Sequence, residues 1–203
     1  MTLRLALIAA LAVAAAGLAV GLVLARDSGE PAATIAGSRP PDGITLPAFD
    51  LPDVDGGRLS SADLRDKVAL VTFLDSQCSD ACPIVASTLA DGLALLTPEE
   101  RGQVVAVAIS TDPEEDTPEA VHAFLEPQGA DGVVRYLVGP LDVLEPLWTE
   151  FAIVTTFESG NDSLHSAPVR IFDPDGVWVS TLNPRADLTP ENVAHDVRAA
   201  LQR

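Results

Sequence analysis

Residues 68–83 read VALVTFLDSQCSDACP, a continuous apolar run followed by a polar turn that carries two cysteines. Val68 to Leu74 is rich in β-branched residues without polar alternation, which is typical of a strand buried on both faces. After Pro83, apolar residues recur at helical spacing, at positions 85, 89, 93 and 96. The cysteines therefore lie at a turn from a buried strand into a helix, and the carboxyl ends of strands commonly form binding sites.

Cys78 and Cys82 stand four positions apart, and the chain has no other cysteine. At a helix start this spacing places both sulfurs on one side, where unpaired N–H groups and the helix dipole favour thiolates. Pro83 fits the first helical turn, because a backbone N–H has no partner to lose there. Two thiolates form a soft ligand pair suited to Cu(I), or a dithiol that can close to a disulfide. The alternative is that Cys82 is a core residue on the apolar stripe of the helix.

The rest of the chain alternates strand and helix patterns. An Asp-Gly-Gly turn at 55–57 predicts an N-terminal β-hairpin, and Asp-Pro-Asp-Gly at 173–176 predicts a second hairpin. Thr-Pro pairs at Thr117 and Thr189 predict helix starts. The expected elements are a hairpin over 49–59, strands at 104–109 and 135–138, helices from 117 and over 141–151 with a bend or break at Pro146, a hairpin over 169–181 and a last helix from 189. This order predicts an α/β domain with a three-layer, thioredoxin-like fold.

Residues 5–25 form an uninterrupted apolar run without charge. Its length matches a bilayer core of roughly 30 Å, so residues 1–26 are predicted to be a single transmembrane helix. A cleaved signal peptide is the alternative, because residues 23–25 (Val-Leu-Ala) would serve as a cleavage site. Residues 27–46 are rich in Pro, Gly, Ala and Ser and are interpreted as a flexible linker, which leaves 47–203 as the working domain. Either interpretation places that domain on the extracytoplasmic side, membrane-anchored in the first case.

The chain carries a formal net charge of −18. Nucleic-acid binding needs a basic face for phosphate contacts, so this charge argues against it. A solvated acidic surface is the favoured interpretation. The acidic run from Asp112 to Asp116 is interpreted in the same way, as a solvated helix entrance rather than a docking or ion-binding loop. One close pair of cysteines also excludes a disulfide scaffold.

Two sulfurs alone leave a metal ion under-coordinated, so the three histidines are the next candidates. His122 and His195 fall within helical patterns and are expected to be exposed helix residues. His165 lies in a loop just before the strand that starts at residue 169. In a thioredoxin-like fold the loop entering this strand faces the cysteine turn, so His165 can complete a Cys₂His site. A loop histidine without a ligand role is the alternative.

Together these residues resemble the Sco/SenC family, exported copper chaperones of thioredoxin-like fold that are linked to assembly of the CuA centre of cytochrome c oxidase. The resemblance extends over residues 46–203. Four features carry it: CSDACP at 78–83, which matches the family's C-x-x-x-C-P, STDPEEDTP at 110–118, ADLRDKV at 62–68, and His165 eight residues before the DPDG of 173–176. The chain departs from the family at 75–76 (Asp-Ser), where an aromatic-Thr pair is usual, and at Leu164, where the family often has an Asp beside the histidine.

The resemblance implies that Cys78, Cys82 and His165 bind copper, as Cu(I), Cu(II) or both, and that the chain is a chaperone rather than an enzyme. It implies delivery to the cytochrome c oxidase subunit that carries CuA, or to another exported copper protein. The competing hypothesis is a thiol-disulfide oxidoreductase that reduces partner cysteines through a redox-active Cys78/Cys82 pair. His165 separates the two, because copper binding needs it and dithiol exchange does not. Pro168 mildly favours the redox hypothesis, whereas Asp75, three residues before Cys78, disfavours a peroxidase.

Overall fold

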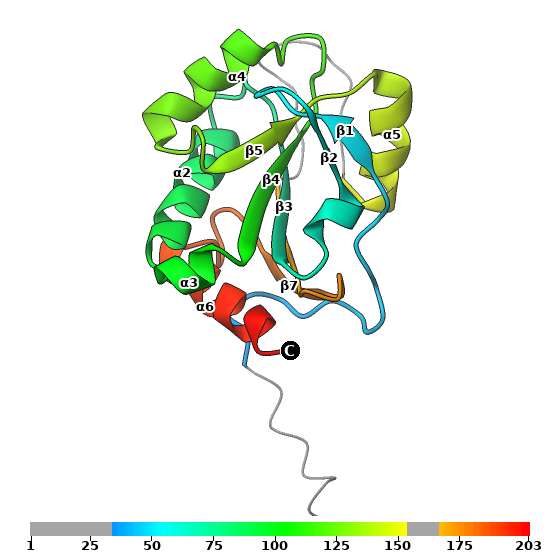
Figure 1. The fold of residues 1–203 in the computed structure, drawn as a ribbon. Helices are drawn as coiled ribbons and strands as arrows, with labels where there is room; N and C mark the ends of the chain where they lie inside the picture. The colour runs from blue at the N-terminus through cyan, green and yellow to red at the C-terminus, as the bar shows by residue number, and fades with distance from the viewer. Residues whose placement is uncertain (1–33, 154–166) are drawn as a thin grey trace, which may run out of the picture. The chain divides into compact units, whose positions relative to one another are not determined.

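The computed structural model describes residues 34–153 and 167–203. A five-stranded mixed sheet lies at the centre of this part of the chain, in the order β5-β4-β3-β6-β7 (Figure 1). β3, β4 and β5 run parallel, whereas β6 is antiparallel to β3 and β7 is antiparallel to β6. The strand bounds are β3 Val68–Leu74, β4 Val104–Ser110, β5 Val134–Leu137, β6 Val169–Phe172 and β7 Trp178–Leu182. The apolar run at 68–74 forms a strand whose residues are all buried, as predicted, and it is the central strand of the sheet.

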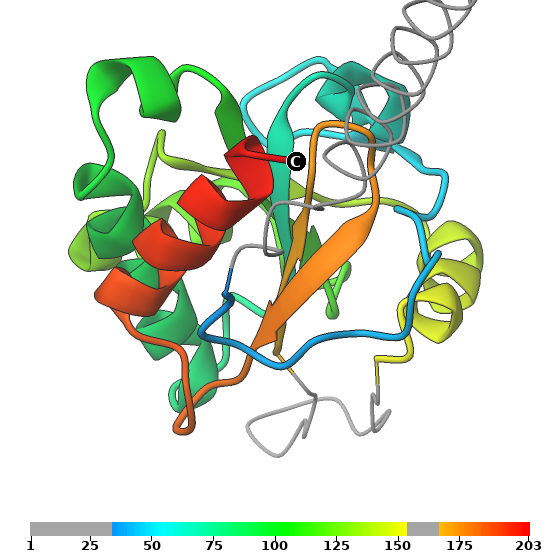
Figure 2. The same cartoon turned by 90° about the horizontal axis from the view of Figure 1, so that it is seen from below.

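Helices cover both faces of this sheet, as predicted for a three-layer α/β domain (Figure 2). Alternate residues of β3 point into two separate hydrophobic clusters. Leu70 and Leu74 pack on the side of α2 and α6, while Val71 and Phe73 pack on the side of α5. The helix bounds are α2 Ala81–Ala94, α3 Pro98–Arg101, α4 Pro118–Leu125, α5 Leu141–Glu150 and α6 Pro190–Leu201, with 3₁₀ turns η1 at Ser61–Leu64 and η2 at Glu126–Gln128.

Two helices begin at the predicted caps. Thr117 Oγ1 accepts a hydrogen bond from Ala120 N, and Thr189 Oγ1 accepts one from Asn192 N, each at 3.2 Å. A proline follows each threonine in the first helical turn, where its missing N–H costs nothing. α5 runs through Pro146 without interruption, so a break, one of the two effects expected of this proline, does not occur.

The predicted N-terminal hairpin is formed by β1 (Asp50–Pro52) and β2 (Arg58–Ser60), which pair antiparallel. The two glycines of its turn have positive φ, a conformation that glycine adopts without steric cost. The chain beside β1 also pairs with β5: Val54 N donates to Tyr136 O and Val138 N donates to Pro52 O, each at 3.0 Å. This pairing covers the β5 edge of the sheet.

The segment before the hairpin covers the opposite edge, at β7. Ser38 and Thr181 exchange two backbone hydrogen bonds of 2.9 Å, and Trp178 N donates to Ile44 O at the same distance. These bonds join residues that are far apart in the sequence.

Asp196 of α6 fixes the start of this segment. Its carboxylate is fully buried and accepts hydrogen bonds from Ala36 N at 2.6 Å, Gly37 N at 3.0 Å and Ser180 Oγ at 2.5 Å. The compact unit of the chain begins at residue 35. Residues 35–46, part of the stretch interpreted as a linker, therefore make contacts with the domain.

The predicted transmembrane helix, residues 1–26, lies outside the described residues. Among the residues that are described, no helix has the length and apolar character needed to cross a bilayer. Membrane anchoring by the N-terminal segment stays a prediction.

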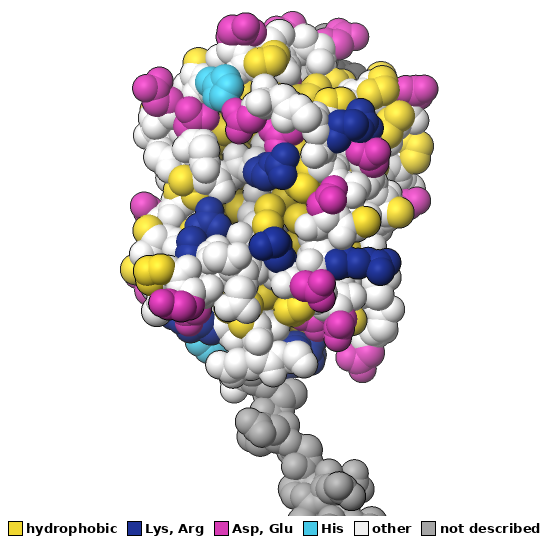
Figure 3. Space-filling model, in the orientation of Figure 1, with side chains coloured by type: hydrophobic (Ala, Val, Ile, Leu, Met, Phe, Trp, Pro, Cys, Tyr) yellow, Lys and Arg dark blue, Asp and Glu magenta, His cyan; other side chains and the backbone are white. Residues whose placement is uncertain are grey.

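Charged side chains of both signs share the surface, and on the face in Figure 3 lysine and arginine side chains lie among aspartate and glutamate. Some of these charges form ion pairs, such as Arg58 Nε with Asp50 at 2.8 Å and Arg135 Nε with Asp53 at 2.6 Å. The net negative charge is thus interspersed with cations on the face shown, in keeping with a solvated surface.

Gly92→Ala is expected to destabilise the domain, although alanine favours helices. A Cβ at position 92 of α2 would lie 2.7 Å from the Cβ of Val193 on α6, closer than nonbonded carbons approach. The clash is expected to lower the free energy of unfolding by about 1–3 kcal/mol, where an uncrowded helix position would gain about 1 kcal/mol. Urea and thermal unfolding measure the change. Gly102→Ala is the control, because its Cβ would meet atoms only at 3.5 Å or beyond. Equal stability of the two variants would contradict this packing.

Candidate functional site

The turn that carries the cysteines is closed by hydrogen bonds to Asp75, the residue directly after β3. Asp75 is 3% exposed. Its Oδ1 accepts a hydrogen bond from Gln77 N at 2.7 Å, and its backbone carbonyl accepts one from Cys78 N at 3.2 Å. A carboxylate that binds the amide two residues further on stabilises a turn. The chain therefore folds back at Cys78 before α2 begins.

Cys82 lies in the first turn of α2 and is fully buried, and Cys78 is half-buried against the same hydrophobic cluster. A hydrogen bond with the Cys78 side chain, together with burial, raises the pKa of Cys82 far above that of an ordinary thiol. The two sulfurs are therefore adjacent, as the spacing predicted. Cys82 is also a core residue, so the two interpretations of its position are compatible.

Asp80 occupies the N-cap position of α2, but its side chain does not cap the helix. The carboxylate pairs instead with the Arg185 guanidinium, and both side chains are largely exposed. The first N–H groups of α2 therefore receive no side-chain oxygen from Asp80. The positive end of the helix dipole faces the cysteine turn, where it stabilises a thiolate.

A buried carboxylate connects this turn to two neighbouring strands. Asp116 is 2% exposed. Its Oδ1 accepts a hydrogen bond from Ser76 N at 2.8 Å, and its Oδ2 accepts from Ser110 Oγ at 2.6 Å and from the Tyr136 hydroxyl at 2.8 Å. Burial raises the pKa of Asp116, while these hydrogen bonds oppose the rise. The interpretation of 112–116 as a solvated helix entrance is wrong for Asp116, which turns inward because three donors compensate its burial.

Asp75 and Tyr136 belong to the site, although neither was predicted from the sequence to have a role there. The Tyr136 hydroxyl is fully buried, and burial and the charge of Asp116 raise its pKa, so it stays a neutral donor. Tyr136 and Cys82 are buried in the same hydrophobic cluster. The signals in the sequence are weak: a carboxylate directly after a buried strand, and the single tyrosine of the chain in an otherwise apolar strand.

The structure brings together two of the three predicted copper ligands. His165, the third, lies outside the described residues, as does Leu164. His122 on α4 and His195 on α6 have side chains 41% and 51% exposed, as expected for surface helix residues. Within residues 34–153 and 167–203, no group of three or more His, Cys, Asp or Glu side chains is arranged to hold a metal ion. The Cys₂His set therefore stays a prediction.

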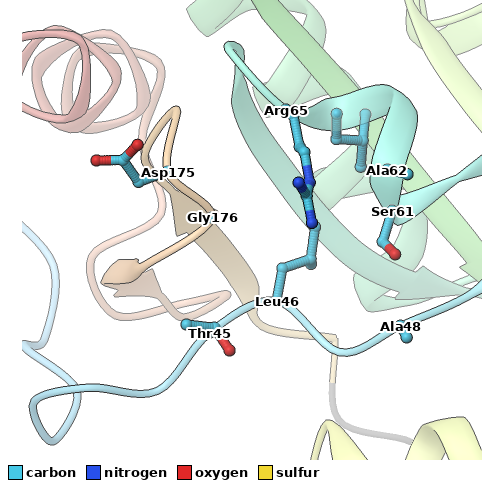
Figure 4. A pocket seen from close by; sticks show the side chains of 9 residues that line it. Thr45, Leu46, Ala48, Ser61, Ala62, Arg65, Asp175 and Gly176 are labelled. Carbon is cyan, nitrogen blue, oxygen red and sulfur yellow. The ribbon is translucent and has the colours of Figure 1, made fainter.

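A pocket of about 320 Å³ lies elsewhere in the domain (Figure 4). It is formed by the segment at 45–48, the η1 turn and the turn between β6 and β7. Because β6 is antiparallel to β3, the β6–β7 turn lies where β3 begins, at the end of the sheet opposite the cysteines. Arg65 and Asp175 line the pocket, and neither cysteine does. The pocket is separate from the candidate site.

The SCO1/SenC family model matches residues 38–202. The chain belongs to the SCO1/SenC family. The family resemblance seen in the cysteine and acidic motifs is thereby confirmed. Among its relatives, Protein sco1 of Schizosaccharomyces pombe is 26% identical over 157 residues, which cover 74% of this chain and 58% of that protein. Mitochondrial Protein SCO2 of Saccharomyces cerevisiae is 23% identical over 145 residues, which cover 68% of this chain and 48% of that protein. The chain thus spans about half the length of these relatives.

Solved structures of the SCO1/SenC family share the fold. ScoI of Bradyrhizobium japonicum, determined with copper bound, is 26% identical, with a TM-score of 0.67 over 78% of this chain and 100% of that chain. Apo Sco1 from Thermus thermophilus is 22% identical, with a TM-score of 0.70 over 85% of this chain and 100% of that chain. The thioredoxin domain of a thiol-disulfide oxidoreductase from Bacteroides vulgatus, 18% identical, gives a TM-score of 0.57 over 77% of this chain and 94% of that chain. The predicted thioredoxin-like fold is therefore confirmed.

Alkylation by iodoacetamide is expected to distinguish the two thiols. Cys78 is half-buried whereas Cys82 is fully buried with a raised pKa, so Cys82 offers little accessible thiolate. The Cys82→Ser variant should react through Cys78 at least about tenfold faster than the Cys78→Ser variant reacts through Cys82. Mass spectrometry of timed samples at neutral pH measures both rates. Equal rates in two folded variants would contradict the burial of Cys82.

Proposed function

We propose that this chain is a copper metallochaperone that binds one copper ion through Cys78, Cys82 and His165. The observation that carries the proposal is the adjacency of the two sulfurs at a strand-to-helix turn, in a chain of the SCO1/SenC family. Thiolates are soft ligands that suit Cu(I), and an imidazole suits copper in either oxidation state. The copper-bound structure of the 26% identical ScoI supports copper as the metal.

The topology of the sheet supports His165 as the third ligand. β6 is antiparallel to β3, so the chain enters β6 at the end of the sheet where β3 leads into the cysteine turn. Ala167, just before β6, is buried in the same hydrophobic cluster as Cys82. His165 precedes Ala167 by two positions in the sequence. A loop that enters the sheet here is therefore suited to supply the imidazole.

Copper uptake displaces the proton of any ligand thiol that carries one, because a thiolate is the ligand. The dipole of α2 favours that ionised form. Three ligands leave one side of the metal open, so a thiolate of a partner can bind before Cys78 or Cys82 dissociates. The ion then passes by ligand exchange without change of oxidation state. The recipient of this proposal is the CuA-bearing subunit of cytochrome c oxidase or another exported copper protein.

The proposal includes the location of the chain. Residues 1–26 are proposed to anchor it in a membrane, with the domain on the extracytoplasmic side, on the strength of the apolar run at 5–25. The proposed Cys₂His site then lies on the same side of the membrane as its exported recipient.

Anaerobic copper titration of the reduced chain tests the site. Wild type is expected to bind one Cu(I) per chain, and Cys78→Ser and His165→Ala are each expected to weaken binding by at least about tenfold, because each removes one of three ligands. Competition with a chromophoric Cu(I) chelator measures the affinity. His122→Ala is the matched control, since His122 lies on α4 and pairs with Asp131 at 2.9 Å. Unchanged affinity in the folded His165→Ala variant would overturn the Cys₂His site.

The second candidate is a thiol-disulfide oxidoreductase, which the contact between Cys78 and Cys82 favours because adjacent thiols can close to a disulfide. In that reaction the Cys78 thiolate attacks a partner disulfide and releases one partner thiolate. The Cys82 thiolate then displaces the second, so two electrons pass to the partner and a Cys78–Cys82 disulfide remains. His165→Ala should leave this exchange unchanged. A wild-type chain that binds no Cu(I) but reduces a model disulfide would favour this candidate.

A further inference from the structure

We infer that Asp116 is a positioning residue for the cysteine pair: its carboxylate fixes the peptide group between Asp75 and Ser76, and that peptide group in turn holds Cys78. Where the inference is tested by copper affinity, it rests on the proposed function. Where it is tested by the redox potential of the two cysteines, it does not.

The peptide group between Asp75 and Ser76 is hydrogen-bonded at both ends. Its N–H, on Ser76, donates to Asp116 Oδ1 at 2.8 Å. Its C=O, on Asp75, accepts from Cys78 N at 3.2 Å. Because a peptide group is planar and rigid, the direction in which Asp116 holds the N–H also sets the direction of the carbonyl. Asp116 therefore acts on Cys78 through a single peptide plane, without touching the sulfur.

The preceding amide reaches the second cysteine. The backbone N–H of Asp75 forms a hydrogen bond with the Cys82 sulfur. Rotation of the 75–76 peptide would thus disturb the backbone next to the contacts of both cysteines. The orientation of this peptide group therefore determines the separation of the two sulfurs. Both copper binding and disulfide closure depend on that separation.

Asp116 is itself held by the sheet. Its Oδ2 accepts hydrogen bonds from Ser110 Oγ at the end of β4 and from the Tyr136 hydroxyl on β5. Asp116 N donates to Asp112 O at 3.0 Å, which fixes the loop that carries it. The neighbouring Thr111 is bound to the end of β3, with its N and Oγ1 donating to Leu74 O at 2.9 and 3.1 Å. Through these bonds the sheet provides the rigid frame for the cysteine turn.

The test compares three variants of the full chain. Asp116→Ala removes the acceptor of the Ser76 amide. Asp116→Asn keeps an oxygen for that amide, and its NH₂ can donate to the hydroxyl oxygens of Ser110 and Tyr136. Ser110→Ala is the matched control, because it deletes one buried hydrogen bond to Asp116 but leaves the bond to Ser76.

Two readouts that a general loss of stability does not move are Cu(I) affinity and the midpoint potential of the Cys78/Cys82 dithiol. Asp116→Ala is expected to weaken copper binding at least about tenfold and to make the disulfide easier to reduce by a similar factor, about 30 mV for a two-electron couple. Asp116→Asn and Ser110→Ala are expected to stay within about threefold of wild type in both. A folded Asp116→Ala chain with wild-type affinity and potential, or a Ser110→Ala chain that matches its losses, overturns the inference.

Two further measurements keep the inference testable if Asp116→Ala does not fold. Ser76→Pro removes the donor N–H and leaves Asp116 its two hydroxyl partners, so the same shifts are expected. In the wild-type chain, hydrogen exchange at the Ser76 amide should be slow, and exchange at the rate of an open turn overturns the inference. If the wild-type chain binds no copper, only the proposed function is overturned. The midpoint potential of the Cys78/Cys82 dithiol still tests the role of Asp116.

Discussion

Strand β3 is paired on both sides, in parallel with β4 and antiparallel with β6, and these two pairings bring the cysteine turn, the loop with Asp116 and the entry to β6 to one end of the sheet. Because β4 is parallel, the loop with Asp116 leaves the sheet at the same end as the cysteine turn. Because β6 is antiparallel, the chain enters β6 at that end too. All seven residues of β3 are buried. A slip of one residue would exchange the side chains between the two clusters, so the register is strongly specified.

Two buried charged side chains of the domain are stabilised differently, one by hydrogen bonds and the other by aromatic rings. Asp116 has three donors around its carboxylate, whereas Nε and Nη1 of Arg170 on β6 have no hydrogen-bond partner in the part of the chain that the structure describes. The Arg170 guanidinium lies 4.9 Å from the centre of the Trp178 ring and 5.8 Å from that of Phe151. Burial lowers the pKa of Arg170. Contact with the two ring faces offsets part of the cost of desolvating this cation.

Local patterns in the sequence were sufficient for the main strands and helices but not for the short helix α3, and they did not predict the polar contacts between elements. The run at 68–74 and the threonine caps at Thr117 and Thr189 predicted β3, α4 and α6, because their signals lie within a few residues. The inward turn of Asp116 depends on donors from three separate segments, which no local pattern reports. The attachment of residues 36–38 depends likewise on Asp196 and β7, about 150 positions away. For His165 the motif spacing gave a ligand prediction, and the described residues do not include it.

The two edges of the sheet are both covered by the chain that precedes β3. Residues 38–46 run beside β7, and residues 52–54 run beside β5. An uncovered edge strand offers free backbone N–H and C=O groups on which another chain can add a strand, which is a common start of aggregation. A domain shortened to begin at β3 would expose both edges at once. The stretch from residue 36 to residue 60 therefore protects the folded domain from self-association, in addition to leading the chain into its core.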